Sequence, residues 1–256
     1  MKPVRPSLPA VLLALSALLL TACATTDTAS TAAQPVEPVA STSLAAELRL
    51  GYFANVTQAS AVYGVGAGTF ADELGSTTLK TQVFNAGPAA VEALFAGSLD
   101  AAYLGPNPAV NGFVRSQGEA LRIVAGATSG GAALVVRGDV TDPQQLRGQK
   151  LASPQTGGTQ DIALRTWLIS QGFTVDEDGG GDVVIRAQEN AQTLSEFQAG
   201  RIAGAWVPEP WASRLVLEGG GRVLVDEGDL WPDGRFVTTH LVVRTCLLYT
   251  SDAADE

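Results

Sequence analysis

From Leu48 onward, the chain alternates short apolar runs with segments of helical periodicity, and the links between them are short. Leu48–Phe53 and Thr78–Phe84 have the composition of strands, whereas the apolar residues of Ala89–Ala96 recur at helical spacing before Gly97. A repeated strand–helix order predicts an α/β fold with mostly parallel sheets. Further strands are expected at 101–104, 121–125, 132–137, 150–153, 183–186, 203–207 and 222–225, and helices at 159–171, 191–198 and 211–217.

Two segments break this alternation. Between Leu121 and Arg137, two strand patterns follow one another with only the linker Thr128–Gly131 between them, and Phe236–Arg244 is a second extended run late in the chain. Such crossings would connect two lobes. Ligands of open α/β sheets bind at the carboxyl ends of strands, so two lobes facing each other would form a cleft there.

The N-terminus has the three parts of an export signal. Lys2 and Arg5 precede an apolar run, Ala10–Leu20, which is shorter than the about 20 residues that span a bilayer, and small residues lead to Cys23. We therefore expect a lipoprotein signal peptide over residues 1–22 and lipid modification of Cys23. The alternative is a buried N-terminal helix with an incidental cysteine. The signal predicts an extracytoplasmic protein that a lipid anchors to the membrane, in the periplasm or on the outer face of the cell membrane.

The segment after Cys23 is unsuited to a packed core. Residues 24–46 are rich in Thr, Ala, Ser and Pro and contain no aromatic residue, so burial could not offset the entropy lost on ordering. We expect residues 23–46 to form a flexible tether. Roughly 200 residues then remain, enough for one large domain or two lobes.

Charge and rare residues exclude several functions. The formal charge of −10 becomes −12 once Lys2 and Arg5 leave with the signal, which excludes a nucleic-acid binder. Two cysteines, one of them Cys23, cannot build a disulfide framework or a zinc site. The one histidine, His240, lies in an apolar strand-like run. We therefore expect no catalytic residues, metal or cofactor, and a protein that is not an enzyme.

Six segments between about Leu48 and Arg244 form a recognisable set: Gly51–Asn55, Gly97–Tyr103, Gly105–Ala109, Leu146–Ala152, Pro154–Asp161 and Ala205–Trp211. Together they resemble the solute-binding proteins of ABC transporters for aliphatic sulfonates, taurine and nitrate, which share the type II periplasmic-binding fold. The resemblance implies two lobes on a hinge that close on a ligand and present it to a permease with its ATPase subunits. Lobe 1 would cover residues 47–130, lobe 2 residues 131–236, and a return strand residues 237–245.

Two segments are the main candidates for holding the ligand. Asn55, Thr57 and Gln58 follow the first strand and open a helix, where free N–H groups favour an anion, although Asn55 and Thr57 acting only as helix caps is equally consistent. In lobe 2 a glycine turn feeds a helix, and the resemblance favours a cleft-facing site over a plain loop and cap. The candidates there are Gln155, Thr156, Gly158, Thr159 and Gln160.

Four further places complete the predicted site. Pro106 and Asn107 belong to a rigid turn that should border the cleft, and Ser129 and Gly130 are either hinge or ligand contacts. Glu209 would repel a bare anion, so it indicates a ligand with an amino or other donor group, or else a carboxylate that stabilises a helix N-terminus. Trp211, like Trp206, would wall an apolar part of the ligand, although tryptophans more often pack in the core.

The C-terminal segment departs from the resemblance, because chains of that family normally continue with further helices on lobe 1. Residues 246–256 instead resemble translated sequencing-adapter sequence, so we expect a non-native tail, an apparently truncated C-terminus and reduced stability. The leading hypothesis is capture of a small anion, an aliphatic sulfonate or taurine first and nitrate second. The alternatives are a binding protein for a heteroaromatic such as a thiamine pyrimidine precursor, which would stack on Trp206 and Trp211, and an extracytoplasmic sensor domain.

Overall fold

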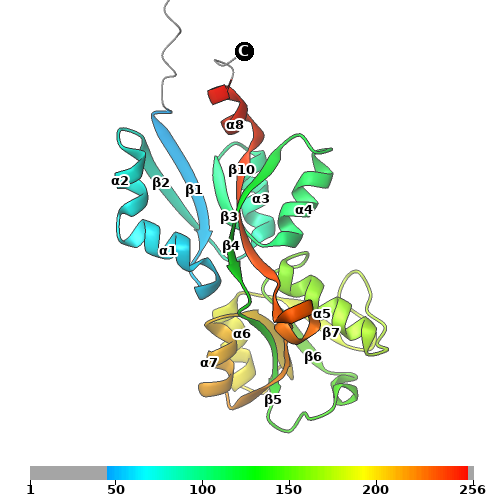
Figure 1. The fold of residues 1–256 in the computed structure, drawn as a ribbon. Helices are drawn as coiled ribbons and strands as arrows, with labels where there is room; N and C mark the ends of the chain where they lie inside the picture. The colour runs from blue at the N-terminus through cyan, green and yellow to red at the C-terminus, as the bar shows by residue number, and fades with distance from the viewer. Residues whose placement is uncertain (1–44, 253–256) are drawn as a thin grey trace, which may run out of the picture. The chain divides into compact units, whose positions relative to one another are not determined.

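The computed structural model describes residues 45–252, with the side chains of residues 249–252 left out. These residues belong to one unit of the chain, residues 40–256. The predicted signal peptide, Cys23, the tether up to residue 44 and the last four residues lie outside the described part. Within it, two five-stranded sheets are each flanked by helices (Figure 1).

The first sheet belongs to lobe 1 and has the strand order β2-β1-β3-β10-β4. Strands β1 and β2 pair in parallel, as do β1 and β3, whereas β10 is antiparallel to both β3 and β4. Its strands are β1 (Glu47–Phe53), β2 (Thr78–Phe84), β3 (Ala101–Leu104), β4 (Leu121–Ser129) and β10 (Val237–Arg244).

The second sheet belongs to lobe 2 and repeats this plan in the order β7-β6-β8-β5-β9. Here β6 is parallel to β7 and β8, and β5 is antiparallel to β8 and β9. In both sheets, therefore, the one antiparallel strand is the strand that arrives from the other lobe. The strands are β5 (Ala132–Arg137), β6 (Lys150–Ser153), β7 (Val184–Ala187), β8 (Gly204–Pro208) and β9 (Gly221–Asp226).

Helices cover both faces of the lobe 1 sheet. One core cluster joins Phe53 and Leu104 to Val91 and Leu94 of α3 (Gly87–Phe95) and to Ala109 of α4 (Pro106–Arg115). A second cluster on the strands includes residues of α1, α2 and α8, among them Leu247 and Leu248 at the C-terminal end. These helices are α1 (Ala59–Gly66), α2 (Thr69–Leu74) and α8 (Thr245–Asp252).

Lobe 2 is also covered on both faces. Leu164, Trp167 and Leu168 of α5 (Thr159–Ser170) pack with the fully buried Trp206, whereas α6 (Asn190–Gln198) and α7 (Trp211–Leu217) pack in a separate cluster. Short 3-10 turns, η3 (Glu227–Leu230) and η4 (Pro232–Gly234), lead from β9 to β10. No helix in residues 45–252 is long and apolar enough to span a bilayer.

The two connections between the lobes lie against each other. Gly130 and Gly131 both have φ near +80°, the left-handed region that glycine adopts without cost, and they turn β4 into β5. Gly130 N and Ser129 Oγ donate to the carbonyl oxygen of Phe236, at 3.1 and 2.8 Å, and Thr238 Oγ1 donates to the Gly130 oxygen at 2.6 Å. Ser129 and Gly130 therefore lie in the connections between the two lobes.

The structure adds helices that the sequence pattern did not indicate. Where a rigid turn was expected at Gly105–Pro108, α4 begins at Pro106, because a proline in the first turn lacks only an N–H that would have no helical partner. Strand β4 also extends to Ser129, four residues beyond the expected end, which shortens the hinge linker.

Candidate functional site

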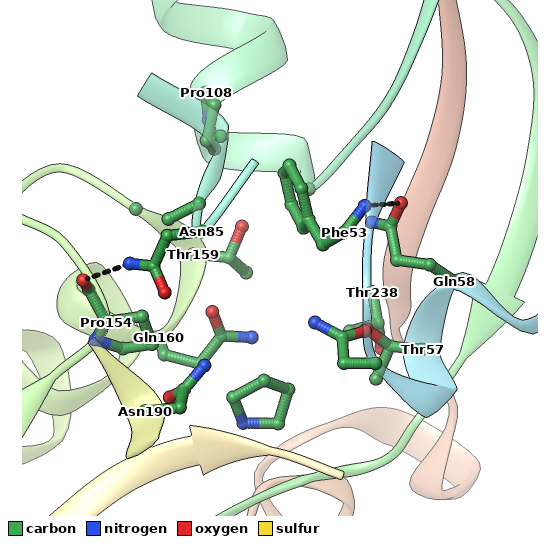
Figure 2. Close-up of a pocket in the computed structure, with 16 residues that line it drawn as sticks. Phe53, Thr57, Gln58, Asn85, Pro108, Pro154, Thr159, Gln160, Asn190 and Thr238 are labelled. Atoms are coloured by element: carbon green, nitrogen blue, oxygen red, sulfur yellow. Dashed lines mark hydrogen bonds between the residues drawn. The ribbon is translucent and has the colours of Figure 1, made fainter. Parts of the chain in front are cut away.

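A cavity lies where the carboxyl ends of parallel strands from both sheets meet. Lobe 1 contributes the residues that follow β1, β2 and β3, and lobe 2 those that follow β6, β7 and β8, while Thr238 comes from the crossing strand β10. This is the edge at which open α/β sheets bind ligands. Lining residues are Phe53, Asn55, Thr57, Gln58, Asn85, Ala86, Gly87, Gly105, Pro108, Pro154, Gly158, Thr159, Gln160, Asn190, Pro208 and Thr238 (Figure 2). We call this space the interlobe cavity.

The lobes are closed over the interlobe cavity. Asn85 Nδ2 of lobe 1 donates to the Pro154 oxygen of lobe 2 at 3.0 Å (Figure 2). Val56 N donates to the Glu209 oxygen, also at 3.0 Å. The remaining volume is about 20 Å³, room for one or two water molecules. An organic ligand therefore enters only when the lobes separate and these hydrogen bonds break.

Among the described residues that line the cavity, none has an ionisable side chain. Attraction for an anion would come instead from the N-termini of α3 and α5, whose first N–H groups have no partner within the helix; α4 offers fewer donors, because Pro106 and Pro108 in its first turn have no N–H. Neutral amides and hydroxyls add directional hydrogen bonds. Such a lining can hold a small polar group and offers no side chain that would exchange protons with it at neutral pH.

Two lining side chains of lobe 2 are buried without a hydrogen-bond partner. They are Thr159 Oγ1 and Asn190 Oδ1, in residues that are 8% and 6% exposed. Burying an unpaired polar group costs about 1–3 kcal/mol, so a ligand that pairs with these atoms recovers part of that cost. In Figure 2 both residues lie near Gln160, between the Asn85–Pro154 pair and the lobe 1 residues Phe53 and Thr57.

Six predicted residues line the cavity. Those of lobe 1 largely bond to one another and to the backbone: Thr57 Oγ1 donates to Asn55 Oδ1 at 2.7 Å, and Gln58 Oε1 accepts from Phe53 N at 3.2 Å. Asn55 makes no side-chain cap to the turn that follows it. The six residues are Asn55, Thr57, Gln58, Gly158, Thr159 and Gln160.

The other predicted residues lie elsewhere. Gln155 and Thr156 belong to the turn before α5 but are not part of the lining, and Pro106 and Asn107 line a separate, larger space. The Glu209 carboxylate accepts from Ser213 N and Oγ, at 3.1 and 3.0 Å, in the first turn of α7. Glu209 therefore stabilises that helix N-terminus, the second of the two roles considered for it.

Neither tryptophan proposed as a wall of the ligand site reaches the interlobe cavity. Trp206 is fully buried, and its Nε1 donates to Glu227 Oε2 at 2.7 Å. Trp211 packs against the α6–α7 cluster, with the Arg214 guanidinium 4.7 Å from its ring centre. Both side chains are part of the core or its margin, as is usual for tryptophan.

Asn85 and Asn190 are lining residues that the sequence pattern did not single out. Asn85 comes directly after β2 and precedes α3. Asn190 comes shortly after β7 and is the first residue of α6. Both residues have the pattern that predicted Asn55, a polar residue between a strand and a helix, so this pattern could have predicted them as well. Gly105 and Pro108 belong to the turn that was expected to border the cleft, and they do line the cavity, whereas Pro208 at the end of β8 was not singled out.

Asp161 fixes the loop that carries the lobe 2 half of the cavity. It is 1% exposed and accepts from Ser153 Oγ at 2.7 Å, Gly157 N at 3.0 Å and Arg165 Nε at 2.9 Å. One carboxylate thus ties the end of β6, the glycine turn and the second turn of α5 together.

Asp161→Asn is expected to lower the free energy of unfolding by about 3 kcal/mol, because it leaves Arg165 without its buried counter-charge. Chemical denaturation measures this change. The control is Glu218→Gln, which breaks an exposed Arg214–Glu218 pair of the same helical spacing and should cost under about 1 kcal/mol. Equal losses in the two variants would contradict the role given to Asp161.

The part of the chain that matches a known family is nearly the same as the part that the structure describes. A model of the NMT1-like family matches residues 42–248, most of the chain. The chain belongs to the NMT1-like family. Its fold is shared with the alkanesulfonate-binding protein SsuA from Xanthomonas axonopodis pv. citri bound to MOPS, at 22% identity and a TM-score of 0.64, over 82% of this chain and 73% of that one.

Other proteins similar to this NMT1-like chain bind nitrate or taurine. The periplasmic nitrate-binding protein NrtA from Synechocystis PCC 6803 is 19% identical with a TM-score of 0.65, over 82% of this chain and 59% of that one. The taurine-binding periplasmic protein of Escherichia coli K12 is 29% identical over 162 residues, 62% of this chain and 47% of that protein. The nitrate/nitrite binding protein NrtA of Nostoc sp. PCC 7120 is 34% identical over 77 residues, 30% of this chain and 17% of that protein.

The chain therefore spans about half or less of the length of these two curated relatives. The structural matches confirm the predicted two-lobed α/β fold of periplasmic-binding type. The family match confirms the resemblance on which that prediction was based.

Proposed function

We propose that this protein is the solute-binding component of an ABC importer, which captures a small anion in the interlobe cavity and delivers it to a permease and its ATPase. An aliphatic sulfonate or taurine is the first candidate and nitrate the second. The family match and the names of the relatives support this assignment. The observation that carries it is the closed cavity at the carboxyl ends of six parallel strands, with helix N-termini around it and the Thr159 hydroxyl as a buried donor that has no partner.

The proposal includes an extracytoplasmic location with Cys23 as the lipid anchor, which would keep the binding lobes near the permease. Mass spectrometry of the protein purified from a bacterial membrane would test the anchor. A diacylglycerol mass on an N-terminal peptide that starts at Cys23 supports it, and an unmodified peptide containing residues 20–23 contradicts it.

Binding is favoured over catalysis because no ionisable side chain is among the described lining residues, and general acid–base chemistry needs one within reach of the reacting group. Residues 45–252 also contain no cluster of three His, Cys, Asp or Glu that could hold a metal ion. The heteroaromatic alternative loses its main support, since Trp206 and Trp211 lie away from the cavity.

Isothermal titration of the purified protein with taurine, ethanesulfonate, hexanesulfonate, nitrate and a 4-amino-pyrimidine tests the proposal. Saturable heat with a sulfonate or nitrate, and none with the pyrimidine, is the expected result. Binding of the pyrimidine alone would overturn the assignment to anions, and the absence of heat with every anion would do the same.

The stability of the free protein and its Kd for the anion together test whether Thr159 contacts the ligand. Thr159→Val removes a buried hydroxyl that has no partner, so we expect the free protein to keep or gain stability, while Kd for the bound anion rises about 5- to 15-fold. Titration and urea denaturation measure the two effects. Thr156→Val is the matched control, because Thr156 lies three residues away and outside the lining. A larger rise in Kd at Thr156 than at Thr159 would refute the assignment.

A further inference from the structure

A second and larger space adjoins the interlobe cavity. It has a volume of about 600 Å³ and lies between α4, α5 and the η3–η4 segment. Its walls include Val110, Ile162, Trp167, Glu227, Trp231 and Phe236, and we call it the apolar chamber. Thr159, whose hydroxyl has no partner, lines both the chamber and the interlobe cavity. Its volume is in the range of pockets that hold organic ligands.

The described residues of the chamber walls are apolar or neutral and polar, with one ionisable exception; the neutral polar residues are Asn107, Asn111, Thr159, Thr166 and Ser170. Trp231 and Phe236 stack with their ring centres 6.0 Å apart and an interplanar angle of 17°, which forms an aromatic surface. Trp231 is 50% exposed, and Val110 and Leu230 are similarly open, so this surface is accessible from solvent. Exposed aromatic rings at a cavity of this size favour an apolar group, and their faces attract a cation.

The exception is Glu227, the one ionisable residue of the lining. The residue is 3% exposed, and one of its two carboxylate oxygens, Oε2, accepts from Trp206 Nε1 at 2.7 Å. A carboxylate has room for further donors, and a buried one without a cation gains most from a donor that carries positive charge. No Arg or Lys is among the lining residues to supply it.

We propose that the apolar chamber is a second ligand subsite, which binds an ammonium-bearing apolar group through Glu227 and the Trp231–Phe236 surface. Because Thr159 lines both spaces, a ligand that holds the lobes apart at this residue can extend from the interlobe cavity into the chamber. The ligand is then a zwitterion whose anionic head occupies the interlobe cavity and whose amine lies in the chamber, an N-substituted aminosulfonate. This inference rests on the proposed function, since the anionic head is the group assigned there.

A matched pair of ligands tests the chamber separately from the head group. 3-(Benzylamino)propanesulfonate and 3-(benzyloxy)propanesulfonate share the sulfonate and the ring and differ in the amine. At pH 8, above the pKa of about 7 that burial gives Glu227, the amine is expected to bind at least about tenfold more tightly than the ether. Equal affinity for the two compounds would overturn the proposal.

Variants then assign the preference to Glu227. Glu227→Gln keeps an acceptor for Trp206 Nε1 but removes the charge, so it should reduce the preference to under about twofold. Asp229→Asn is the control, because it removes the same charge from an exposed position of the same turn, outside the lining, and it should leave the preference intact. A preference that persists in Glu227→Gln contradicts the assignment.

A second variant guards against misfolding of Glu227→Gln. Trp231→Ala removes a half-exposed wall, which a folded protein tolerates, and should weaken binding of the amine about 5- to 30-fold. An unchanged affinity would exclude the aromatic surface as a contact. If no sulfonate binds at all, benzylamine and benzyl alcohol test the chamber alone. Preferential binding of benzylamine would then support the subsite although the proposed function fails. Equal binding of the two compounds, or no binding, would overturn both the subsite and the proposed function.

Discussion

Replacing Gly105 by alanine is expected to raise the Kd of a bound anion roughly 5- to 150-fold, the equivalent of about 1–3 kcal/mol of overpacking. A Cβ at Gly105 would lie 2.1 Å from Thr159 Oγ1 and 3.1 Å from Thr159 Cβ, across the interlobe cavity. The backbone of Gly105 is extended, so alanine strains nothing locally and acts only by holding the lobes apart. Affinity falls because the closed form becomes less populated.

Titration with the anion that gives heat in the panel, together with small-angle scattering of the free protein, measures both consequences. The radius of gyration should increase as Kd rises. Gly126→Ala is the matched control, because a Cβ at Gly126 on β4 meets nothing within 4 Å. If Gly105→Ala leaves Kd and the radius of gyration unchanged, closure of the lobes through this contact is refuted.

Glu227→Gln is expected to change how stability depends on pH. Burial raises the pKa of Glu227 from 4.5 to about 7, with a smaller contribution from Asp226 and opposition from the Trp206 hydrogen bond. The folded protein therefore binds more protons than the unfolded chain between pH 4.5 and about 7, so this group lowers stability as pH rises through that window. The loss amounts to about 3 kcal/mol at pH 8 relative to pH 4.5, and it should be absent in Glu227→Gln.

Urea denaturation of both proteins at pH 5 and pH 8 measures the difference. His240 acts in the opposite sense, because burial lowers its pKa below 6.5 and its contribution to stability grows as pH rises. It is present in both proteins and cancels when they are compared. The pKa values of Asp100 and Asp182 are lowered below 3.8. The contributions of these two groups to stability therefore change at a pH more acidic than pH 5. If the free energy of unfolding changes equally between pH 5 and pH 8 in wild type and variant, the raised pKa of Glu227 is refuted.

Local patterns predicted the strands well because each strand is a short apolar run that is bounded by turn residues. Thr78–Phe84, Ala101–Leu104 and Ala132–Arg137 have the predicted bounds, and the linker of Gly130 and Gly131 indicated the hinge. Strand ends also located Asn55 and Thr159, since a polar residue between a strand and a helix lies at the carboxyl edge of the sheet.

What the pattern could not provide was contact between residues far apart in sequence. Glu209 follows β8 as Asn55 follows β1, yet its side chain turns back to Ser213, which only the path of α7 determines. Two of the four tryptophans, Trp206 and Trp231, look alike in the sequence, and they differ in their partners: Glu227 lies beside the buried Trp206, and Phe236 lies beside the half-exposed Trp231. The chamber is formed by three distant segments.

The last strand of the chain, β10, joins the sheet of lobe 1, and this fixes the order in which the two lobes can fold. Lobe 2 draws all five of its strands from residues 132–226, so it can close as soon as that stretch has been synthesised. In lobe 1, β10 separates β3 from β4, and residues 101–104 wait for residues 240–243. Until then the buried strand β3 has an open edge, the kind that pairs with other chains. The half of the protein made first is thus the half completed last, and it is the half most in need of protection while the chain emerges.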